Sequence, residues 1–327
     1  MGRFLDFRQM SGPQTIELDA QYRQLREECG LAEDADRGLL VIGGPEAAEY
    51  LQGQLTNDVE ALEPGDAAYA ALLDRKGHMQ ADMRVLRPGE EPELLLDLEP
   101  EGLEAARRHL GMYKIGRQVE VSDESEGHTL LSLIGPRSVE IAGTAALPES
   151  ACETTTIGGA QCVAVGTASG IDLILATAKR EPVREALLTS GAVEVTPEAA
   201  EILRIETGRP RFGAEMGTET MPAEAGIVEQ AVSFTKGCYI GQETVARLHY
   251  KGKPNRHLRG LRFSAPAQRG AALRLGEKEV GTVGSAALSP ALGPIGLAIV
   301  RREAEPGATL TVGEDGVTAE VVALPFG

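Results

Sequence analysis

The chain has 327 residues, of which 42% are apolar, and a formal net charge of −17 at pH 7. Its length exceeds that of one compact domain, so we expect two or three structural units. The negative charge repels a polyphosphate backbone and argues against general nucleic-acid binding. No apolar stretch approaches the ~18 residues of a membrane span, which predicts a soluble, cytoplasmic protein.

The first predicted elements form a pattern that occurs twice. Residues 39–45 and 130–136 each contain an apolar strand that ends in Gly-Pro, and proline suits the first turn of the helix expected next. After the first copy the pattern predicts strands over 68–73, 83–86, 94–98 and 119–121 and a helix over 101–110. After the second it predicts strands over 162–165 and 171–175 and a helix over 183–188. Each copy is interpreted as a β-α-β-β-α-β unit of an α+β fold.

The last third of the chain has a different pattern. Thr196-Pro197-Glu198 predicts the start of a helix, because it offers a capping hydroxyl, a proline at the first position and an acid in the first turn. This helix is expected to continue to Thr207. From residue 258 onward only short strands separated by glycine-rich turns are expected, as in a small barrel. The chain therefore divides into residues 1–125, 126–250 and 251–327.

Neither a disulfide framework nor a metal cage is predicted. The four cysteines are Cys29, Cys152, Cys162 and Cys238, and they show no Cys-x-x-Cys spacing. The five histidines form no regularly spaced set. The one pairing left open is Cys152 with Cys162, which a hairpin could bring together.

The motif Lys-Gly-Cys-Tyr-Ile-Gly-Gln-Glu begins at Lys236 and opens a basic stretch. Residues 236–262 contain seven basic residues and one acid, whereas the rest of the chain has 25 basic and 48 acidic residues. An anionic ligand or partner would explain this segregation, and pairing with acidic neighbours is the alternative. Lys236 and the start of the helix expected at Gln242 both favour a thiolate at Cys238, which makes it a candidate reactive thiol. The alternative is a small buried residue in a tight turn.

With this motif, and with residues 51–59, 72–79, 203–213 and 222–226 in matching order, the chain resembles the YgfZ/GcvT folate-binding superfamily and, within it, the YgfZ branch. The resemblance implies a GcvT-like fold of two ferredoxin-like units around a central channel, plus a C-terminal β-barrel. It implies tetrahydrofolate or a derivative as ligand. It also implies a role in biogenesis or repair of iron–sulfur proteins, with client or assembly proteins as partners. Cys238 would act on such a partner, on a cluster precursor or on an adduct of the folate.

The resemblance also assigns two carboxylates. In the family's glycine-cleavage aminomethyltransferases, a glutamate in Leu-Arg-Leu-Glu-Ala-Gly hydrogen-bonds the pterin, and the matching residue is Glu206, for which pairing with Arg209 or Arg211 is the alternative. Their Asp-Asp-Leu segment reads Ala81-Asp82-Met83 here. We expect the missing carboxylate to be the catalytic one, which leaves Asp82 as a catalytic candidate or a structural residue.

The missing carboxylate and the presence of Cys238 argue against glycine-cleavage activity. Aminomethyl or one-carbon transfer is therefore the alternative function, and a tRNA-modification factor the third. Asn57 and Asp58 are candidates for lining the channel, with turn capping as the alternative, and Tyr69 could contact ligand or pack as a strand tyrosine. The other candidate folate contacts are Arg209, Tyr239, Gln242 and Glu243.

Overall fold

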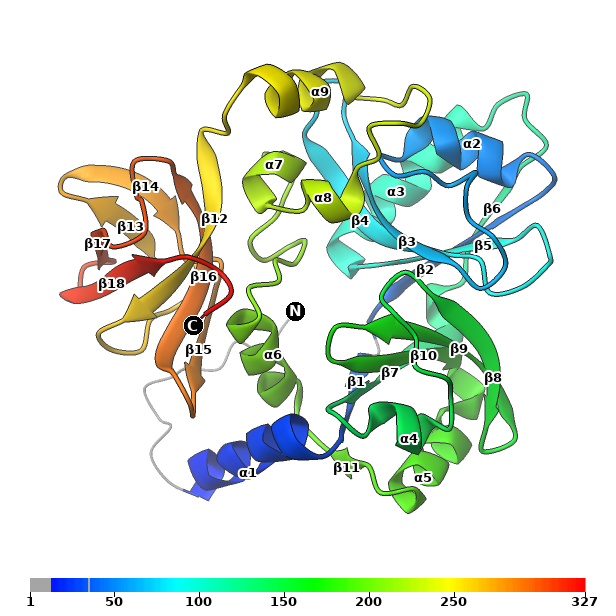
Figure 1. Ribbon diagram of the computed structural model, residues 1–327, viewed down its shortest axis with the longest axis horizontal. Helices are drawn as coiled ribbons and strands as arrows, with labels where there is room; N and C mark the ends of the chain where they lie inside the picture. Colours follow the sequence, from blue (N-terminus) through cyan, green and yellow to red (C-terminus); the bar gives the residue numbers. More distant parts are fainter. Residues whose placement is uncertain (1–12, 35, 327) are drawn as a thin grey trace.

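The computed structural model describes residues 13–34 and 36–326. Two helix-covered sheets face each other, and a third sheet, formed by the C-terminal part of the chain, lies to their side (Figure 1). Several short helices and the N-terminal helix α1 (Pro13–Glu27) connect these parts. Within the described residues, no helix combines the length and the apolar character needed to cross a bilayer.

The first sheet has five strands in the order β3-β4-β5-β2-β6. Two helices pack on one of its faces, and their apolar side chains form a buried core with those of the strands. Pro100 opens the second helix, where its missing N–H costs nothing. The elements are β2 (Gly38–Gly43), α2 (Ala47–Gln54), β3 (Ala67–Leu73), β4 (Met79–Leu86), β5 (Leu94–Leu98), α3 (Pro100–Tyr113) and β6 (Glu120–Asp123).

The second sheet repeats this order with one insertion. Its strands run β8-β9-β10-β7-β1-β11, so β1 from the start of the chain enters between the counterparts of β2 and β6. The elements are β1 (Gly30–Asp34), β7 (His128–Ile134), α4 (Ser138–Ala142), β8 (Cys152–Ile157), β9 (Ala160–Thr167), β10 (Gly170–Ala176), α5 (Arg180–Thr189) and β11 (Val193–Glu194), with the 3-10 turns η2 (Ser125–Gly127) and η3 (Thr177–Lys179).

The predicted duplication is confirmed. Each unit has three strands between its two helices, whereas the predicted β-α-β-β-α-β order has two. In the second unit the extra strand is β8, whose Thr-rich sequence alternates buried and exposed positions. All four cysteines are free. Cys152 lies opposite Val165 and Cys162 lies opposite Thr155, so the hairpin does not bring the two thiols together.

The connecting helices are α6 (Pro197–Glu206), α7 (Pro222–Ala225), α8 (Val228–Ala231) and α9 (Gln242–Lys251). Helix α6 begins at Pro197 as expected and packs between α1 and the C-terminal sheet. In Figure 1, α9 lies at the top of the molecule, where the chain passes from the first sheet to the C-terminal one.

The C-terminal sheet has seven antiparallel strands. The sequence pattern predicts six, over residues 258–263, 273–275, 280–283, 295–300, 309–312 and 318–324, and so misses one strand. Its β14 lies against β16 as well as β13, which curls the sheet into a barrel-like form around its own apolar core. The strands are β12 (Arg256–Phe263), β13 (Ala272–Leu275), β14 (Lys278–Thr282), β15 (Ser285–Ser289), β16 (Gly293–Arg301), β17 (Thr309–Val312) and β18 (Val317–Val322).

Candidate functional site

Lys236 holds the motif loop against the end of helix α2. Its ammonium donates to the backbone oxygens of Gln52, Leu55 and Asn57, each at 2.7 Å. The oxygens of Gln52 and Leu55 lie at the end of helix α2, where backbone oxygens have few partners of their own and carry the partial negative charge of the helix. Burial lowers the pKa of Lys236 to about 8. All three ammonium protons are thus donated to backbone oxygens, so Lys236 offers no hydrogen bond to the Cys238 thiol, and activation of that thiol by the charge of Lys236 stays a prediction.

Replacing Lys236 by Met is expected to lower the free energy of unfolding by about 2–4 kcal/mol, because three carbonyls lose a charged donor while the side-chain volume is kept. Urea unfolding measures this change. Lys253→Met, at an exposed position, is the matched control and should stay within about 0.5 kcal/mol of the wild type. Equal stability of the two variants would refute the anchoring role.

Two glycines shape the loop that carries Cys238. Gly241 has φ +86°, and a Cβ there would lie 2.6 Å from the backbone oxygen of Asp74. Gly77, with φ +85°, packs in turn against Thr244. The thiol of Cys238 is exposed, so the alternative of a small buried turn residue is wrong.

The other predicted residues of the motif separate into buried and exposed ones. Tyr239 is buried, which raises its pKa to about 12, and its ring centroid lies 5.3 Å from the Lys236 ammonium. Gln242 and Glu243 form the first turn of α9, where Glu243 is exposed. Tyr239 is therefore buried, while Glu243 faces solvent at the start of α9.

Asn57 and Asp58 fix the turn that follows α2. The Asn57 amide donates to the backbone oxygens of Tyr69 and Gln230, at 2.8 and 3.0 Å, and Asp58 accepts a bond of 2.8 Å from Gln52. These contacts hold the turn in place, which is the alternative to the expectation that Asn57 and Asp58 line the channel. The turn consequently ties strand β3 to the segment that leads into the motif.

Asp82 presents an unpartnered carboxylate oxygen. The Tyr69 hydroxyl donates to its Oδ2 at 2.5 Å, whereas the buried Oδ1 has no hydrogen-bond partner. The side chain is 8% exposed, and burial raises the pKa of Asp82. An unpaired carboxylate oxygen in such a place is costly to the fold, so it marks a position where a ligand could supply a donor.

The neighbouring position, Ala81, faces the opposite side of strand β4. A Cβ on Gly102 of helix α3 would lie 2.8 Å from the Cβ of Ala81. Successive residues of a strand point to opposite faces, so a carboxylate at position 81 would point into the helix layer. We expected the carboxylate that is missing at position 81 to be the catalytic one. The structure does not support this, because Asp82, and not position 81, lies on the strand face that is turned away from the helices.

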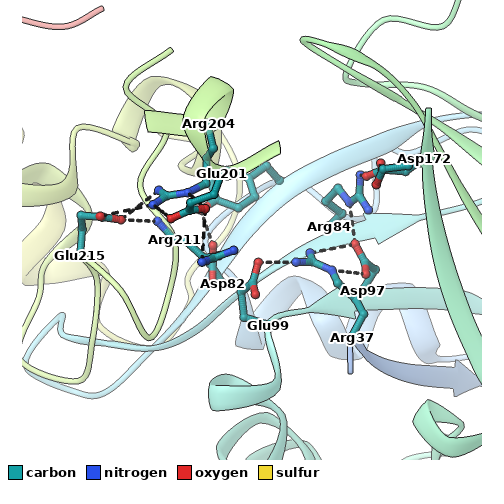
Figure 2. A network of polar contacts seen from close by, with 12 residues as sticks. Arg37, Asp82, Arg84, Asp97, Glu99, Asp172, Glu201, Arg204, Arg211 and Glu215 are labelled. Carbon is teal, nitrogen blue, oxygen red and sulfur yellow. Dashed lines mark hydrogen bonds and ion pairs between the residues drawn. The ribbon is translucent and has the colours of Figure 1, made fainter. Parts of the chain in front are cut away.

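An arginine–carboxylate network extends from Asp82 toward the second sheet (Figure 2). Arg37 binds Asp97 through two bonds of 2.7 and 3.1 Å and also pairs with Glu99. Arg84 binds Asp97 at 2.6 Å and, across the gap between the sheets, Asp172 at 2.6 Å. The two guanidinium groups hold the pKa of Asp97 at about 2 although its burial opposes this. Arg84 thereby joins the two units at the site.

The second half of the network joins helix α6, the segment that follows it and strand β15 of the barrel. Arg204 forms a two-pronged pair with Glu201, at 2.7 and 2.8 Å, and binds Glu215 at 3.1 Å and Ser285 at 2.6 Å. Arg211 lies 3.4 Å from Glu201. In Figure 2, Asp82 lies between this half and the half that contains Glu99.

Three acids lie where the two halves of the network meet: Asp34, Asp82 and Glu99. We call them the carboxylate cluster. Burial raises the pKa of each of them, against the opposing effect of Arg37. Arg211 also opposes the shift at Asp34 and Glu99. The cluster is therefore rich in hydrogen-bond acceptors that are only partly neutralised. Sequence reasoning missed this arrangement, although Arg84 and Asp97 stand out as charges inside apolar strands.

Glu206 lies on another side of α6. Its two carboxylate oxygens accept hydrogen bonds from Tyr22 of α1 at 3.1 Å and from Ser289 of the barrel at 2.5 Å. Neither of the expected alternative partners binds it, because Arg209 pairs with Glu149 and Arg211 with Glu201. The structure thus gives Glu206 a joining role between α1 and the barrel, and does not bring it together with Asp82.

The basic stretch also divides into two groups. Arg256 binds the buried Glu224 at 2.9 and 2.8 Å, and Lys236 is engaged by α2. The exposed group comprises Arg247, Lys251 and Lys253. Arg259 donates to the backbone oxygen of Leu258 at 3.1 Å, and the Arg262 guanidinium lies 5.7 Å from the centroid of the Phe326 ring. Contacts within the protein therefore account for four of the seven basic residues, and the exposed cations are the other three.

The chain matches the GCVT N-terminal domain over residues 2–236 and the glycine cleavage T-protein C-terminal barrel domain over residues 256–326. It is 30% identical to an aminomethyltransferase of Rubrobacter xylanophilus, over 99% of this chain and 90% of that protein. An aminomethyltransferase of Saccharopolyspora erythraea is also 30% identical, over 94% of this chain and 89% of its own length.

Among solved structures, the glycine cleavage system aminomethyltransferase T from Bartonella henselae has the same fold, with a TM-score of 0.84 at 22% identity. The match covers 95% of this chain and 89% of that one. The GcvT-like α+β fold that the sequence predicted is confirmed. By these matches and by its paired sheets and C-terminal barrel, the chain belongs to the GcvT family of glycine cleavage T-protein-like proteins.

Proposed function

We propose that the chain binds tetrahydrofolate or a derivative at the carboxylate cluster, between the two sheets. The observation that carries the proposal is the buried, unpartnered Oδ1 of Asp82. A reduced pteridine presents several N–H donors along its edge, and a carboxylate is a strong acceptor for them. Family membership supports this ligand, since the aminomethyltransferases of the family use tetrahydrofolate.

Calorimetric titration of tetrahydrofolate into the full chain tests the proposal. We expect saturable binding with one site per chain, and no comparable heat from p-aminobenzoylglutamate, which lacks the pteridine. An identical response to both compounds would show that the pteridine is not what the protein recognises, and absence of any heat of binding would contradict the proposal.

We further propose that the protein acts in the manner of the YgfZ branch, in the biogenesis or repair of iron–sulfur proteins, with Cys238 as the functional thiol. The motif resemblance supports this, as does the exposure of Cys238 on a loop that Lys236 and two glycines hold in place. In this proposal the thiol acts on a partner protein while folate occupies the cluster. A cytoplasmic location and the absence of a nucleic-acid partner stay predictions from the sequence.

Aminomethyl transfer is the second candidate function, because Asp82 occupies the strand face toward the second sheet and the relatives compared above are named aminomethyltransferases. The two candidates separate in a reconstituted glycine-cleavage assay. With the partner proteins of that system and tetrahydrofolate, we expect no folate-dependent turnover above the level of the Asp82→Asn variant. Turnover that requires both tetrahydrofolate and Asp82 would favour the transferase.

A further inference from the structure

Helix α9 is poorly covered for a helix of ten residues, since Val245 is its one buried side chain. Its outer end carries a cluster of three rings. The His249 ring stacks on Phe234 with centroids 4.0 Å apart, and Tyr250 meets both rings edge-on, at 4.8 and 5.9 Å. Tyr250 is 67% exposed. Apolar rings left in water at one spot are typical of a surface that another molecule covers.

The same surface is cationic. Arg247, Tyr250 and Lys251 are spaced i, i+3 and i+4, so they share one face of the helix, and Lys253 follows directly. All three cations are exposed, and within residues 13–34 and 36–326 none of them forms an ion pair. Tyrosine and arginine are the residues that most often dominate binding at protein interfaces.

Cys238 lies four residues after Phe234, a member of the ring cluster, so their Cα atoms are at most about 14 Å apart. About five extended residues span that distance. A short extended segment of a partner could therefore contact the rings and cations of α9 and present its own sulfur to Cys238. This short separation along the chain allows one bound segment to reach both features.

We propose that the outer face of α9, formed by Arg247, His249, Tyr250, Lys251 and Lys253 with Phe234 beneath it, is a docking surface for an acidic segment of a partner protein that presents a group to Cys238. The class of partner follows from the charge of the surface itself. Three exposed cations without an ion pair to any described residue match the carboxylates of a short acidic segment, and such a segment stays within the patch, whereas an extended polyphosphate would also run over the acidic surface elsewhere. The inference rests on the thiol role proposed above, names its partner class, and requires no folate.

A thiol–disulfide exchange assay with the full chain tests this surface. The probe is a nine-residue peptide rich in Asp and Glu, with one Leu and a terminal cysteine held as a mixed disulfide with thionitrobenzoate. The Cys238 thiolate attacks the peptide sulfur, a protein–peptide disulfide forms, and thionitrobenzoate leaves with the electron pair of the broken bond. Release is followed by absorbance. Cys29, Cys152 and Cys162 are buried, and Cys238→Ala gives the background rate.

With the wild type, we expect the rate to saturate with the acidic peptide and to exceed that of an equally long serine peptide at least tenfold at subsaturating concentration. The triple variant Arg247→Glu, Lys251→Glu, Lys253→Glu should abolish this preference. Tyr250→Ser should raise the half-saturating concentration several-fold. The matched control carries the same charge change at three exposed sites elsewhere, Arg108→Glu, Lys179→Glu and Arg302→Glu, and should retain at least half of the preference.

Three results would overturn the proposal. One is a wild-type rate that neither saturates nor prefers the acidic peptide, and another is an equal loss in the control triple, which would reduce the effect to net charge. The third is a pair of observations: a twelve-nucleotide single-stranded RNA slows the reaction of Cys238 with the probe, and the protein shows no preference among the peptides. That pair would assign the surface to nucleic acid. Tetrahydrofolate binding by the α9 triple variant separates this test from that of the proposed function.

Discussion

Asp82→Asn is expected to make the ligand-free protein more stable at pH 7, by about 1–2 kcal/mol, while weakening tetrahydrofolate binding at least tenfold. The stability gain arises because a buried carboxylate with one unpartnered oxygen becomes neutral beside Asp97 and Glu99. The loss of affinity arises because a charged acceptor for a ligand N–H is removed. Chemical unfolding and calorimetry measure the two effects.

The stability gain should depend on pH with a defined sign. Burial raises the pKa of Asp82 above its ordinary value of about 3.9, so between these two values the folded protein binds a proton that the unfolded chain has lost. The contribution of Asp82 to stability therefore falls as the pH rises through this window. The difference between Asp82→Asn and wild type should be small near pH 4 and should grow as the pH rises above it.

Asp19→Asn, an exposed substitution on α1, is the matched control and should change neither stability nor affinity measurably. A destabilised Asp82→Asn protein with normal folate affinity would assign Asp82 to the structure of strand β4 instead of to a ligand site.

Cys238→Ala is expected to abolish the ability of the protein to restore iron–sulfur enzyme activity in a host strain that lacks the corresponding gene. Its stability and folate affinity should stay near those of the wild type, because the thiol is exposed and its removal leaves the Lys236 anchor intact. Aconitase activity in extracts measures the rescue.

Cys162→Ala is the control for this experiment. Burial raises the pKa of Cys162, so its thiol is held in the unreactive form, and rescue should be retained. Full rescue by Cys238→Ala at equal protein levels would exclude an essential role of the thiol and would leave folate binding as the function to be explained.

The sequence predicts the arrangement of the fold well because local signals agree with one another. Proline after glycine marks the helices that follow β2 and β7, and the short strands after residue 258 have clear turn residues between them. Strand β1 was missed because it pairs with β7, almost one hundred residues away along the chain, as an insertion that no local pattern reveals. Strand β8 was missed because its threonines lack an apolar pattern.

The site was harder to predict, since its charges find partners across long sequence separations. Arg84 meets Asp172 of the other sheet, and Lys236 meets carbonyls of α2, which carry no side-chain signal at all. Glu206 was expected at the ligand from the motif, but Ser289 of the barrel already binds its oxygen. Strand alternation alone could have separated Ala81 from Asp82, because consecutive residues face opposite sides.

The most direct test of the account is a crystal structure of the protein grown with 5-formyltetrahydrofolate. The account predicts the pteridine between the two sheets, with one of its N–H groups within 3.2 Å of the Asp82 Oδ1 and with Glu206 still bound to Tyr22 and Ser289. A pteridine bound to Glu206, or elsewhere while Asp82 keeps its oxygen unpartnered, would contradict it.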